Sequence, residues 1–115
     1  LDYPQSQAAL AQTYVGEDGF TWARRFELFV DQVELCNGYT ELTDAAEQRR
    51  RFAADLEIRR GMNKPLPPID ENFLEALESG MPACSGVALG LDRLFMLAMG
   101  KKEIKDVILF PSPIA

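Results

Sequence analysis

The sequence predicts an α+β fold in which an antiparallel β-sheet is flanked by helices, and three features support this prediction. Two β-prone runs, residues 25–30 and 33–42, are separated by only two residues and indicate a β-hairpin. Two stretches with helix-capping residues lie on either side of a proline-rich segment. A glycine-spaced apolar run, residues 86–91, precedes a third helical stretch. The 115 residues suffice for one modest domain.

The first half of the chain contains the hairpin and one long helix. Residues 5–22 are mixed and turn-rich, with a loop at residues 16–19. Asp31 and Gln32 form the hairpin turn. Thr43 or Asp44 then caps a helix that runs to about Arg60 and ends at Gly61.

The second half begins with a linker, because the prolines of residues 64–68 cannot continue a helix. Asp70 caps a second helix that ends at Gly80 and whose apolar stripe comprises Phe73, Leu74 and Leu77. After the glycine-spaced strand, residues 92–99 form a helix stopped by Gly100. Residues 107–110 are predicted to form a last short strand.

Composition excludes several kinds of site. The net charge is −6, with 18 acidic and 12 basic residues, which argues against this segment gripping a nucleic-acid backbone. The basic run Arg49–Arg51 is interpreted as a solvated helix face. The chain has no histidine, and Cys36 and Cys84 are isolated, so neither histidine chemistry nor a structural zinc site is expected. Isolated thiols and the lack of a membrane-length apolar run favour a cytoplasmic protein without a membrane partner.

Two carboxylates of the hairpin fall on one face. With a two-residue turn, Phe29 faces Glu34 and Glu27 faces Cys36, which makes Glu27 and Glu34 diagonal neighbours. Two such carboxylates repel each other unless a cation lies between them, and Mg²⁺ suits carboxylate oxygens combined with substrate phosphates. The alternative is that both are ordinary solvent-facing strand residues.

Glu41 is a candidate for binding an ammonium group. Strict alternation places it on the face opposite Glu34, but a bulge at Asn37–Gly38 would re-aim it. Tyr39 would then pack along the aliphatic stem of the bound group. The alternative is a surface glutamate near the end of a strand.

The glycine-spaced strand forms a second candidate site. Gly86, Ala88 and Gly90 share one face and would form a flat floor for a planar ring. Arg93, in the first turn of the next helix, can hold a phosphate oxygen and stabilise developing charge. The alternative is close strand–helix packing with Asp92 as a cap.

Three blocks in this order resemble the lysine branch of the class II aminoacyl-tRNA synthetases: Phe26–Phe29, Glu34–Asp44 and Gly90–Arg93. The Gly-Leu-Asp-Arg block looks like motif 3 of that class, and Ile104–Pro111 resembles the end of such enzymes. The resemblance runs from about Tyr3 to Pro111. It implies that residues 1–115 are the C-terminal part of a class II synthetase-like catalytic domain.

The resemblance also implies roles for individual residues. These are Glu27 and Glu34 for Mg²⁺ on the ATP phosphates, Glu34 and Leu35 for the ATP site, Asn37 and Tyr39 for the amino acid, Glu41 for its side-chain ammonium, Gly90 beneath the adenine, and Arg93 on the γ-phosphate as the catalytic arginine.

The residue at position 88 distinguishes two groups of enzymes within this branch. Lysyl-tRNA synthetases have glycine at the positions of Gly86, Ala88 and Gly90, and the added methyl narrows the pocket. Alanine resembles a truncated paralogous branch that activates (R)-β-lysine and attaches it to a lysine of elongation factor P. The alternatives are a genuine lysyl-tRNA synthetase that charges tRNA-Lys with lysine, and a non-catalytic synthetase-like module.

We expect the chain to be a fragment, because the N-terminal half of the family's catalytic domain, with its dimer helix and arginine-bearing second motif, has no counterpart here. The fragment alone should therefore be inactive. Its parent is expected to be a homodimer through that half.

Overall fold

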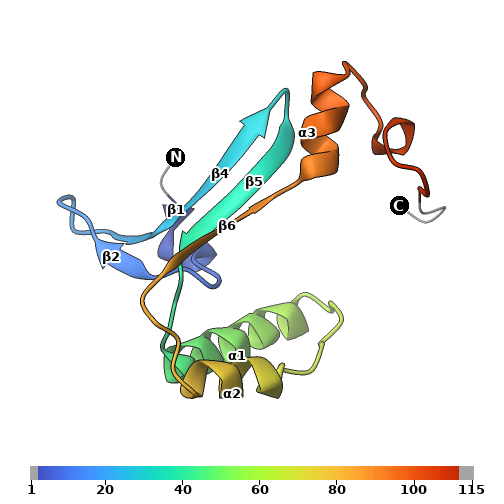
Figure 1. Ribbon diagram of the computed structural model, residues 1–115. Coiled ribbons are helices and arrows are strands. Elements are labelled where there is room, and N and C mark those ends of the chain that lie inside the picture. The colour runs from blue at the N-terminus through green and yellow to red at the C-terminus, as the bar shows by residue number, and fades with distance from the viewer. Residues whose placement is uncertain (1–2, 112–115) are drawn as a thin grey trace.

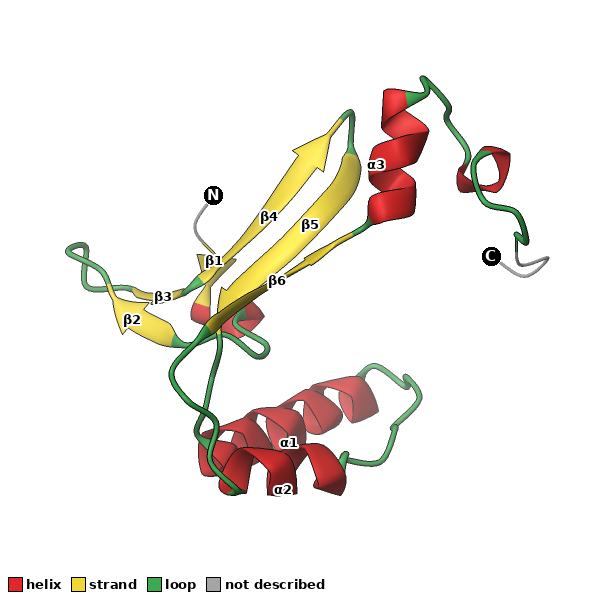
Figure 2. Cartoon of the chain, viewed as in Figure 1, coloured by secondary structure: helices red, strands yellow, loops and turns green. Residues whose placement is uncertain are grey.

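The computed structural model describes residues 3–111 (Figures 1 and 2). The elements, in chain order, are β1 (Tyr3–Pro4), η1 (Gln5–Gln7), β2 (Thr13–Val15), β3 (Thr21–Ala23), β4 (Arg25–Val30), β5 (Val33–Thr40), α1 (Ala45–Gly61), α2 (Glu71–Glu78), β6 (Ser85–Leu89), α3 (Leu91–Ala98) and η2 (Ile104–Asp106). The strands form two antiparallel sheets, ordered β1–β3–β2 and β4–β5–β6. The predicted α+β class is therefore confirmed.

Strands β2 and β3 of the first sheet are absent from the sequence prediction, which described residues 5–22 only as turn-rich. In the structure β2 and β3 form a hairpin around the predicted loop, where Gly19 has a φ of +78°. The strands are only three residues long, too short for a clear alternation pattern. This sheet is joined to the second one at Arg24, whose backbone bonds to Gln12 and Thr40.

The predicted hairpin is confirmed as β4 and β5. Its two-residue turn has positive φ at both Asp31 (+48°) and Gln32 (+66°), the backbone of a type I′ turn. Type I′ turns match the natural twist of the flanking strands, so the turn fixes Val30 opposite Val33 and Phe29 opposite Glu34, as predicted.

The register beyond this point differs from the prediction. The pairing shifts between Leu28 and Phe29, so that Leu28 pairs with Cys36 and Glu27 with Asn37 rather than with Cys36. Leu35 is the extra residue on β5. A β-bulge of this kind cannot be read from a two-residue turn, because the turn fixes only the pairs beside it.

Helices α1 and α2 form an antiparallel hairpin below the second sheet (Figure 1). The predicted caps are confirmed: Asp44 accepts a hydrogen bond from the Glu47 amide at 2.9 Å, and Asp70 accepts one from the Phe73 amide at 3.0 Å. The predicted stripe of α2 buries Leu74 and Leu77. The proline linker lies in neither a helix nor a strand, which agrees with the prediction that it ends the first helix.

The basic run on α1 is not simply a solvated face, which corrects the prediction. Arg49 makes two hydrogen bonds to Glu71 of α2, at 2.9 and 2.6 Å. Arg51 donates to the carbonyl groups of Ala9 (3.1 Å) and Ala11 (2.7 Å), so it holds the loop before β2. Arg49 and Arg50 remain exposed, whereas only 17% of the Arg51 side chain is exposed. Helical spacing cannot distinguish these roles, because they depend on what packs beside the helix.

The C-terminal end also departs from the prediction. Residues 107–110 are not a strand; the 3₁₀ turn η2 precedes them and irregular backbone follows. A strand needs a neighbour for its backbone groups, and within residues 3–111 none lies beside this segment. Helix α3 is confirmed and ends at Ala98, two residues before Gly100, which has a φ of +63°.

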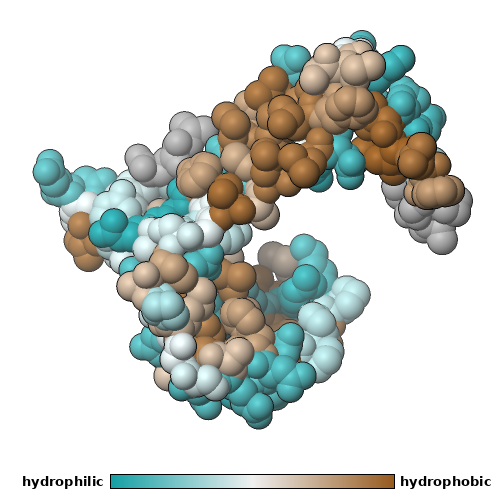
Figure 3. All heavy atoms as spheres, viewed as in Figure 1, coloured by the Kyte–Doolittle hydropathy of each residue, from teal (hydrophilic) through white to brown (hydrophobic). Residues whose placement is uncertain are grey.

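Large apolar surfaces stay exposed. The buried cluster at the junction of the two sheets contains only small side chains, Ala8, Ala11 and Ala23, with Tyr3 and Tyr39 packed against it. The radius of gyration is 17.2 Å, whereas a compact domain of similar length has about 13 Å. In Figure 3 apolar residues gather over α3 and the adjoining end of the sheet. None of the helices described between residues 3 and 111 is both long and apolar enough to span a membrane.

Candidate functional site

The second sheet has one polar face and one apolar face. Across the three strands Arg25, Tyr39 and Gly86 are in register, as are Glu27, Asn37 and Ala88. Register partners point to the same side, so these six residues define what we call the polar face. The opposite face carries Phe26, Leu28, Cys36, Gly38, Val87 and Leu89. Candidate residues from three separate strands therefore meet on one surface.

The bulge at Leu35 brings Glu34 to this face. Glu34 pairs with Phe29, which lies two residues from Glu27 on β4 and so shares its side. The predicted proximity of Glu27 and Glu34 is therefore kept, although the pairing of Glu27 was wrong. The negative charges of both carboxylates contribute to raising the pKa of Tyr3, which agrees with their common location.

Glu41 also reaches the polar face, but not for the reason given from the sequence. The irregularity lies at Leu35, not at Asn37–Gly38, and β5 is regular from Cys36 to Thr40. The Glu41 side chain lies over Gly86: its Oε1 is 2.6 Å from the position that a Cβ on Gly86 would occupy. Glu41 thus faces the same side as Tyr39, two residues before it.

The backbone of Glu41 is held from both sides. Its amide donates to the Cys84 carbonyl at 3.0 Å, and its carbonyl accepts from Gln12 Nε2 at 3.0 Å. Gln12 lies in the segment whose carbonyl groups bind Arg51 of α1. The candidate ammonium-binding carboxylate is therefore fixed to β6, to the first sheet and, through Arg51, to the helical hairpin.

Glu27 belongs to a compact polar cluster. Tyr3 donates its hydroxyl to Glu27 Oε2 at 2.7 Å, and this bond is the main reason that the pKa of Tyr3 is raised. Arg25 forms an ion pair with Glu27 Oε1, and both side chains are largely shielded, with 10% and 16% of their surfaces exposed. Asn37 Nδ2 approaches the same oxygen at 3.4 Å, at the long end of hydrogen bonding.

Asn37 carries an unused acceptor. Its Oδ1 is buried and has no hydrogen-bond partner within the described part of the chain. A buried acceptor without a partner costs free energy, so such an atom commonly awaits water or a ligand donor. An amino group bound on the polar face would satisfy it.

The floor of the site is open. Gly86 and Ala88 are exposed on β6, the edge strand of the sheet. The methyl of Ala88 stands beside Asn37, its register partner. Gly90 lies just past the strand, where it precedes α3, and so only two of the three predicted floor residues are on the strand itself.

Arg93 lies in the first turn of α3, as predicted. Its Nη1 donates to the backbone carbonyl of Glu34 at 2.8 Å, and the Gly90 amide donates to the Leu35 carbonyl at 2.8 Å. A Cβ on Gly90 would lie 3.2 Å from Cδ of Arg93, so the glycine leaves room for the arginine. Within residues 3–111 Arg93 forms no ion pair with a carboxylate, and its side chain is exposed.

Leu35 has a different environment from the one expected of an ATP-lining side chain. Its side chain is buried and its carbonyl is bonded to Gly90. Its contribution to a nucleotide site remains a prediction.

The donor set would fit Mg²⁺ only together with phosphate ligands. Within the described residues no group of three or more acidic, histidine or cysteine side chains is placed to hold a metal. Mg²⁺ commonly takes one or two protein carboxylates and completes its shell with phosphates and water. Glu27 and Glu34 match that pattern, although Glu27 already bonds to Tyr3 and Arg25. The set suits an ion that arrives with a nucleotide rather than a resident one.

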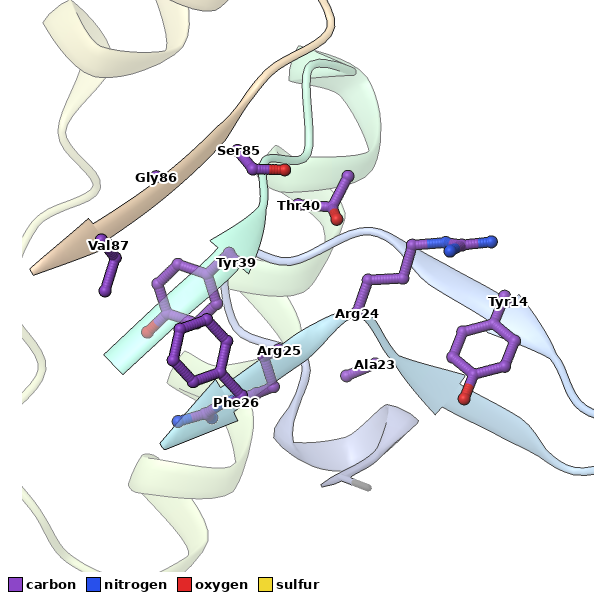
Figure 4. Close-up of a pocket in the computed structure, with 10 residues that line it drawn as sticks. All are labelled: Tyr14, Ala23, Arg24, Arg25, Phe26, Tyr39, Thr40, Ser85, Gly86 and Val87. Carbon is purple, nitrogen blue, oxygen red and sulfur yellow. The ribbon is translucent and has the colours of Figure 1, made fainter. Parts of the chain in front are cut away.

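Two hollows border the sheet. One, of about 540 Å³, lies between the N-terminal segment, Glu27 and α1, and it adjoins the polar face. The other, of about 500 Å³, is lined by residues of both faces, with Phe26 and Val87 from the apolar face and Tyr39 and Gly86 from the polar face (Figure 4). Both hollows therefore adjoin candidate residues: Glu27 lines the first, and Tyr39 and Gly86 line the second.

Sequence reasoning missed Tyr3, Gln12 and Arg25 as parts of this site. Arg25 precedes the Phe-Glu-Leu-Phe block and alternates with Glu27, so its face could have been deduced. Tyr3 and Gln12 come from the first sheet, which had no clear sequence signal.

Comparisons with known proteins identify the family of the chain. Residues 1–113 match the family model described as tRNA synthetases class II (D, K and N). The chain is 55% identical over 109 residues to the elongation factor P–(R)-β-lysine ligase of Proteus mirabilis, and 50% identical over 108 residues to that of Salmonella dublin. These matches cover 95% and 94% of the chain and 33% of each relative. The chain thus spans about a third of the length of these curated relatives.

The predicted resemblance is confirmed, because the family model covers nearly the whole sequence and the alignments to these relatives extend over most of it. The chain belongs to the class II tRNA synthetases of the D, K and N group.

Proposed function

We propose that this chain is the C-terminal part of the catalytic domain of an ATP-dependent ligase that activates a lysine-type amino acid. Its preferred substrate is (R)-β-lysine, and its acceptor is a lysine of elongation factor P. The relatives in Proteus and Salmonella are elongation factor P–(R)-β-lysine ligases, which supports this choice. The full-length protein would act as a homodimer in the cytoplasm.

The observation that carries the proposal is the polar face. It gathers two carboxylates, an unpartnered amide oxygen and a third carboxylate over a glycine floor, with an arginine at the rim. This set matches the three charged parts of the reaction: a triphosphate, an α- or β-amino group and a terminal ammonium. A surface of ordinary solvent-facing strand residues would not need Gly86 beneath Glu41.

The amino acid would lie along β5. Asn37 Oδ1 accepts from the amino group near the carboxylate end, Tyr39 packs along the methylene chain, and Glu41 binds the terminal ammonium. Ammonium–carboxylate hydrogen bonds are stronger than neutral ones, which makes Glu41 the residue that selects a basic side chain. Ala88 lies beside Asn37, where one methyl shifts the seat of the amino group.

ATP would lie toward the α3 end of the face. Glu27 and Glu34 would hold Mg²⁺, which would supply charge neutralisation on the phosphates. Arg93 would contact the γ-phosphate, with Gly90 beneath the adenine and Leu35 and Glu34 at the edge of the nucleotide. The amino-acid carboxylate then attacks the α-phosphate, which gives the aminoacyl-adenylate and pyrophosphate. Arg93 offsets the negative charge on the departing pyrophosphate. The acceptor amine attacks the acyl carbon and AMP leaves.

ATP–pyrophosphate exchange by the full-length protein tests the proposal, with L-lysine and (R)-β-lysine compared and both repeated after Ala88→Gly. We expect exchange with (R)-β-lysine, shifting toward L-lysine in the variant. One methyl changes discrimination by about 1–3 kcal/mol, or roughly 10- to 200-fold.

Other outcomes point to other functions. Preference for L-lysine by the unmodified protein, together with charging of tRNA-Lys, would assign it to the lysyl-tRNA synthetases. Absence of exchange with either isomer, and of magnesium-dependent ATP binding, would leave a non-catalytic module.

A further inference from the structure

We propose that Arg25 is a positioning residue of this site, which holds the Glu27 carboxylate and the Tyr39 ring in their working places. The inference rests on the proposed function to the extent that Glu27 and Tyr39 contact substrates. Arg25 itself has no assigned ligand. It acts through the residues around it.

Arg25 is held by partners from three parts of the chain. Its Nη2 pairs with Glu27 on the same strand, and its Nη1 donates to the Gln7 carbonyl of η1 at 2.7 Å. Its Cζ lies 4.4 Å from the centre of the Tyr3 ring and 5.4 Å from that of Tyr39. The guanidinium therefore connects β4, β5 and the N-terminal segment in one rigid group.

The burial of Arg25 makes these contacts strong. Only 10% of its side chain is exposed, so water competes weakly for its hydrogen bonds. Glu27 would otherwise be a shielded carboxylate with only the Tyr3 hydroxyl and the long Asn37 contact. Arg25 fixes one oxygen of Glu27 and also offsets its charge, which lowers the repulsion between Glu27 and Glu34.

Arginine is required by this geometry. A planar guanidinium can donate in two directions while it stacks on an aromatic ring, whereas a lysine ammonium is a point charge without a stacking plane. Arg25→Lys would keep the charge near Glu27 but lose the simultaneous contacts with Gln7 and the two tyrosine rings. Arg25→Gln would lose the charge as well.

Arg24 is a matched control in the neighbouring position. It is the residue between β3 and β4, and it is exposed, with its Cζ 4.8 Å from the centre of the Tyr14 ring. Figure 4 shows the two arginine side chains leaving the strand in different directions, Arg24 toward Tyr14 and Arg25 away from it. The same substitution can therefore be made one residue away, outside the polar face.

The experiment uses the full-length protein with Arg25→Gln, Arg25→Lys and Arg24→Gln. Three quantities are measured: kcat and KM for pyrophosphate exchange per folded active site, calorimetric affinity for the amino acid, and the thermal unfolding midpoint. Exchange is measured well below each variant's midpoint. We expect Arg25→Gln to lower kcat/KM by roughly 10²-fold, the loss associated with a misplacement of about 1 Å. Arg25→Lys should be intermediate and Arg24→Gln within about twofold of the parent.

A merely structural role would give another result: a lower midpoint with unchanged kcat, KM and amino-acid affinity in the folded protein. That result, or an equal loss in Arg24→Gln, would overturn the proposal.

Failure of the proposed function is distinguishable, because the parent itself would then show no exchange. In that case crystal structures of the parent and of Arg25→Gln decide the matter. The inference expects Glu27 and Tyr39 to change rotamer or lose order in the variant, and unchanged side chains would refute it.

Discussion

Gly86→Ala separates folding from ligand recognition at Glu41. The Cβ that alanine introduces would lie 2.6 Å from Glu41 Oε1 and 3.8 Å from its Cδ. Because non-bonded heavy atoms settle at roughly 3.5 Å, the carboxylate must withdraw by about 1 Å. Strand backbone tolerates alanine, and the clashing atom is the end of a flexible side chain. The free energy of unfolding should therefore change little.

The affinity for the amino-acid substrate should fall more than the stability of the fold. If Glu41 accepts hydrogen bonds from a substrate ammonium, displacement weakens a charge-assisted bond of about 1.5–3 kcal/mol, roughly 10- to 100-fold in affinity. The loss should concern only ligands with that ammonium. Calorimetry on the full-length protein would compare the lysine isomer that the parent activates with its analogue lacking the terminal amine. The parent should discriminate between the two ligands, and Gly86→Ala should lose most of that discrimination.

Gly61→Ala provides the control. A Cβ there meets nothing within 4 Å, and Gly61 is the last residue of α1. It should leave both affinities unchanged and stabilise the protein by about 0.4–1 kcal/mol through the unfolded chain. Unchanged discrimination in Gly86→Ala would refute the role of Glu41, and a large loss of stability would refute the steric argument.

Three further predictions concern stability and pH. Arg51→Gln should lower the free energy of unfolding by about 1.5–3 kcal/mol, because it removes charged hydrogen bonds to two loop carbonyl groups. In the same urea titration the control Arg50→Gln, at an exposed position, should change this free energy by less than about 0.5 kcal/mol. Equal effects of the two substitutions would contradict the different roles of Arg50 and Arg51. Gln32→Gly should stabilise the hairpin by about 0.5–1 kcal/mol, since Gln32 has a φ of +66°; a loss of stability would argue against the type I′ turn. The raised pKa of Tyr3 means that the folded state binds the phenol proton more tightly than the unfolded chain does. The contribution of Tyr3 to the free energy of unfolding is therefore complete below pH 10 and is lost as the pH rises through the folded-state pKa. Subtracting the ultraviolet phenolate titration of Tyr3→Phe from that of the parent should reveal one phenol that titrates above pH 10; a phenol titrating at or below that pH would exclude the bond to Glu27.

Local chemistry made much of the fold predictable. Asp44, Asp70, Gly80 and Gly100 mark helix ends because capping and left-handed residues act within one turn. Features that depend on packing could not be predicted in this way. The first sheet has strands too short for periodicity, and the four residues of the expected last strand have no partner strand in the described chain.

The membership of the candidate site was predictable in part, but its geometry was not. Glu27 and Glu34 were expected on one face from a regular ladder, and they do share a face, although the ladder is irregular. Glu41 was expected to need a bulge at Asn37–Gly38, whereas the bulge lies at Leu35. Arg25 was overlooked because its role comes from Gln7, Tyr3 and Tyr39, residues that only the fold brings beside it.

The bulge at Leu35 explains why these parts form one unit. In a regular ladder Glu34 and Asn37, three residues apart, would point to opposite faces. The extra residue turns Glu34 toward the polar face. It lies where the carbonyl groups of Glu34 and Leu35 accept hydrogen bonds from Arg93 and Gly90. One local irregularity thus places Glu34 on the same face as Asn37 and Tyr39 and also fixes the start of α3 beside them. A substitution that removed the bulge would therefore disturb Glu34 and Arg93 together, even though 59 residues separate them in the sequence.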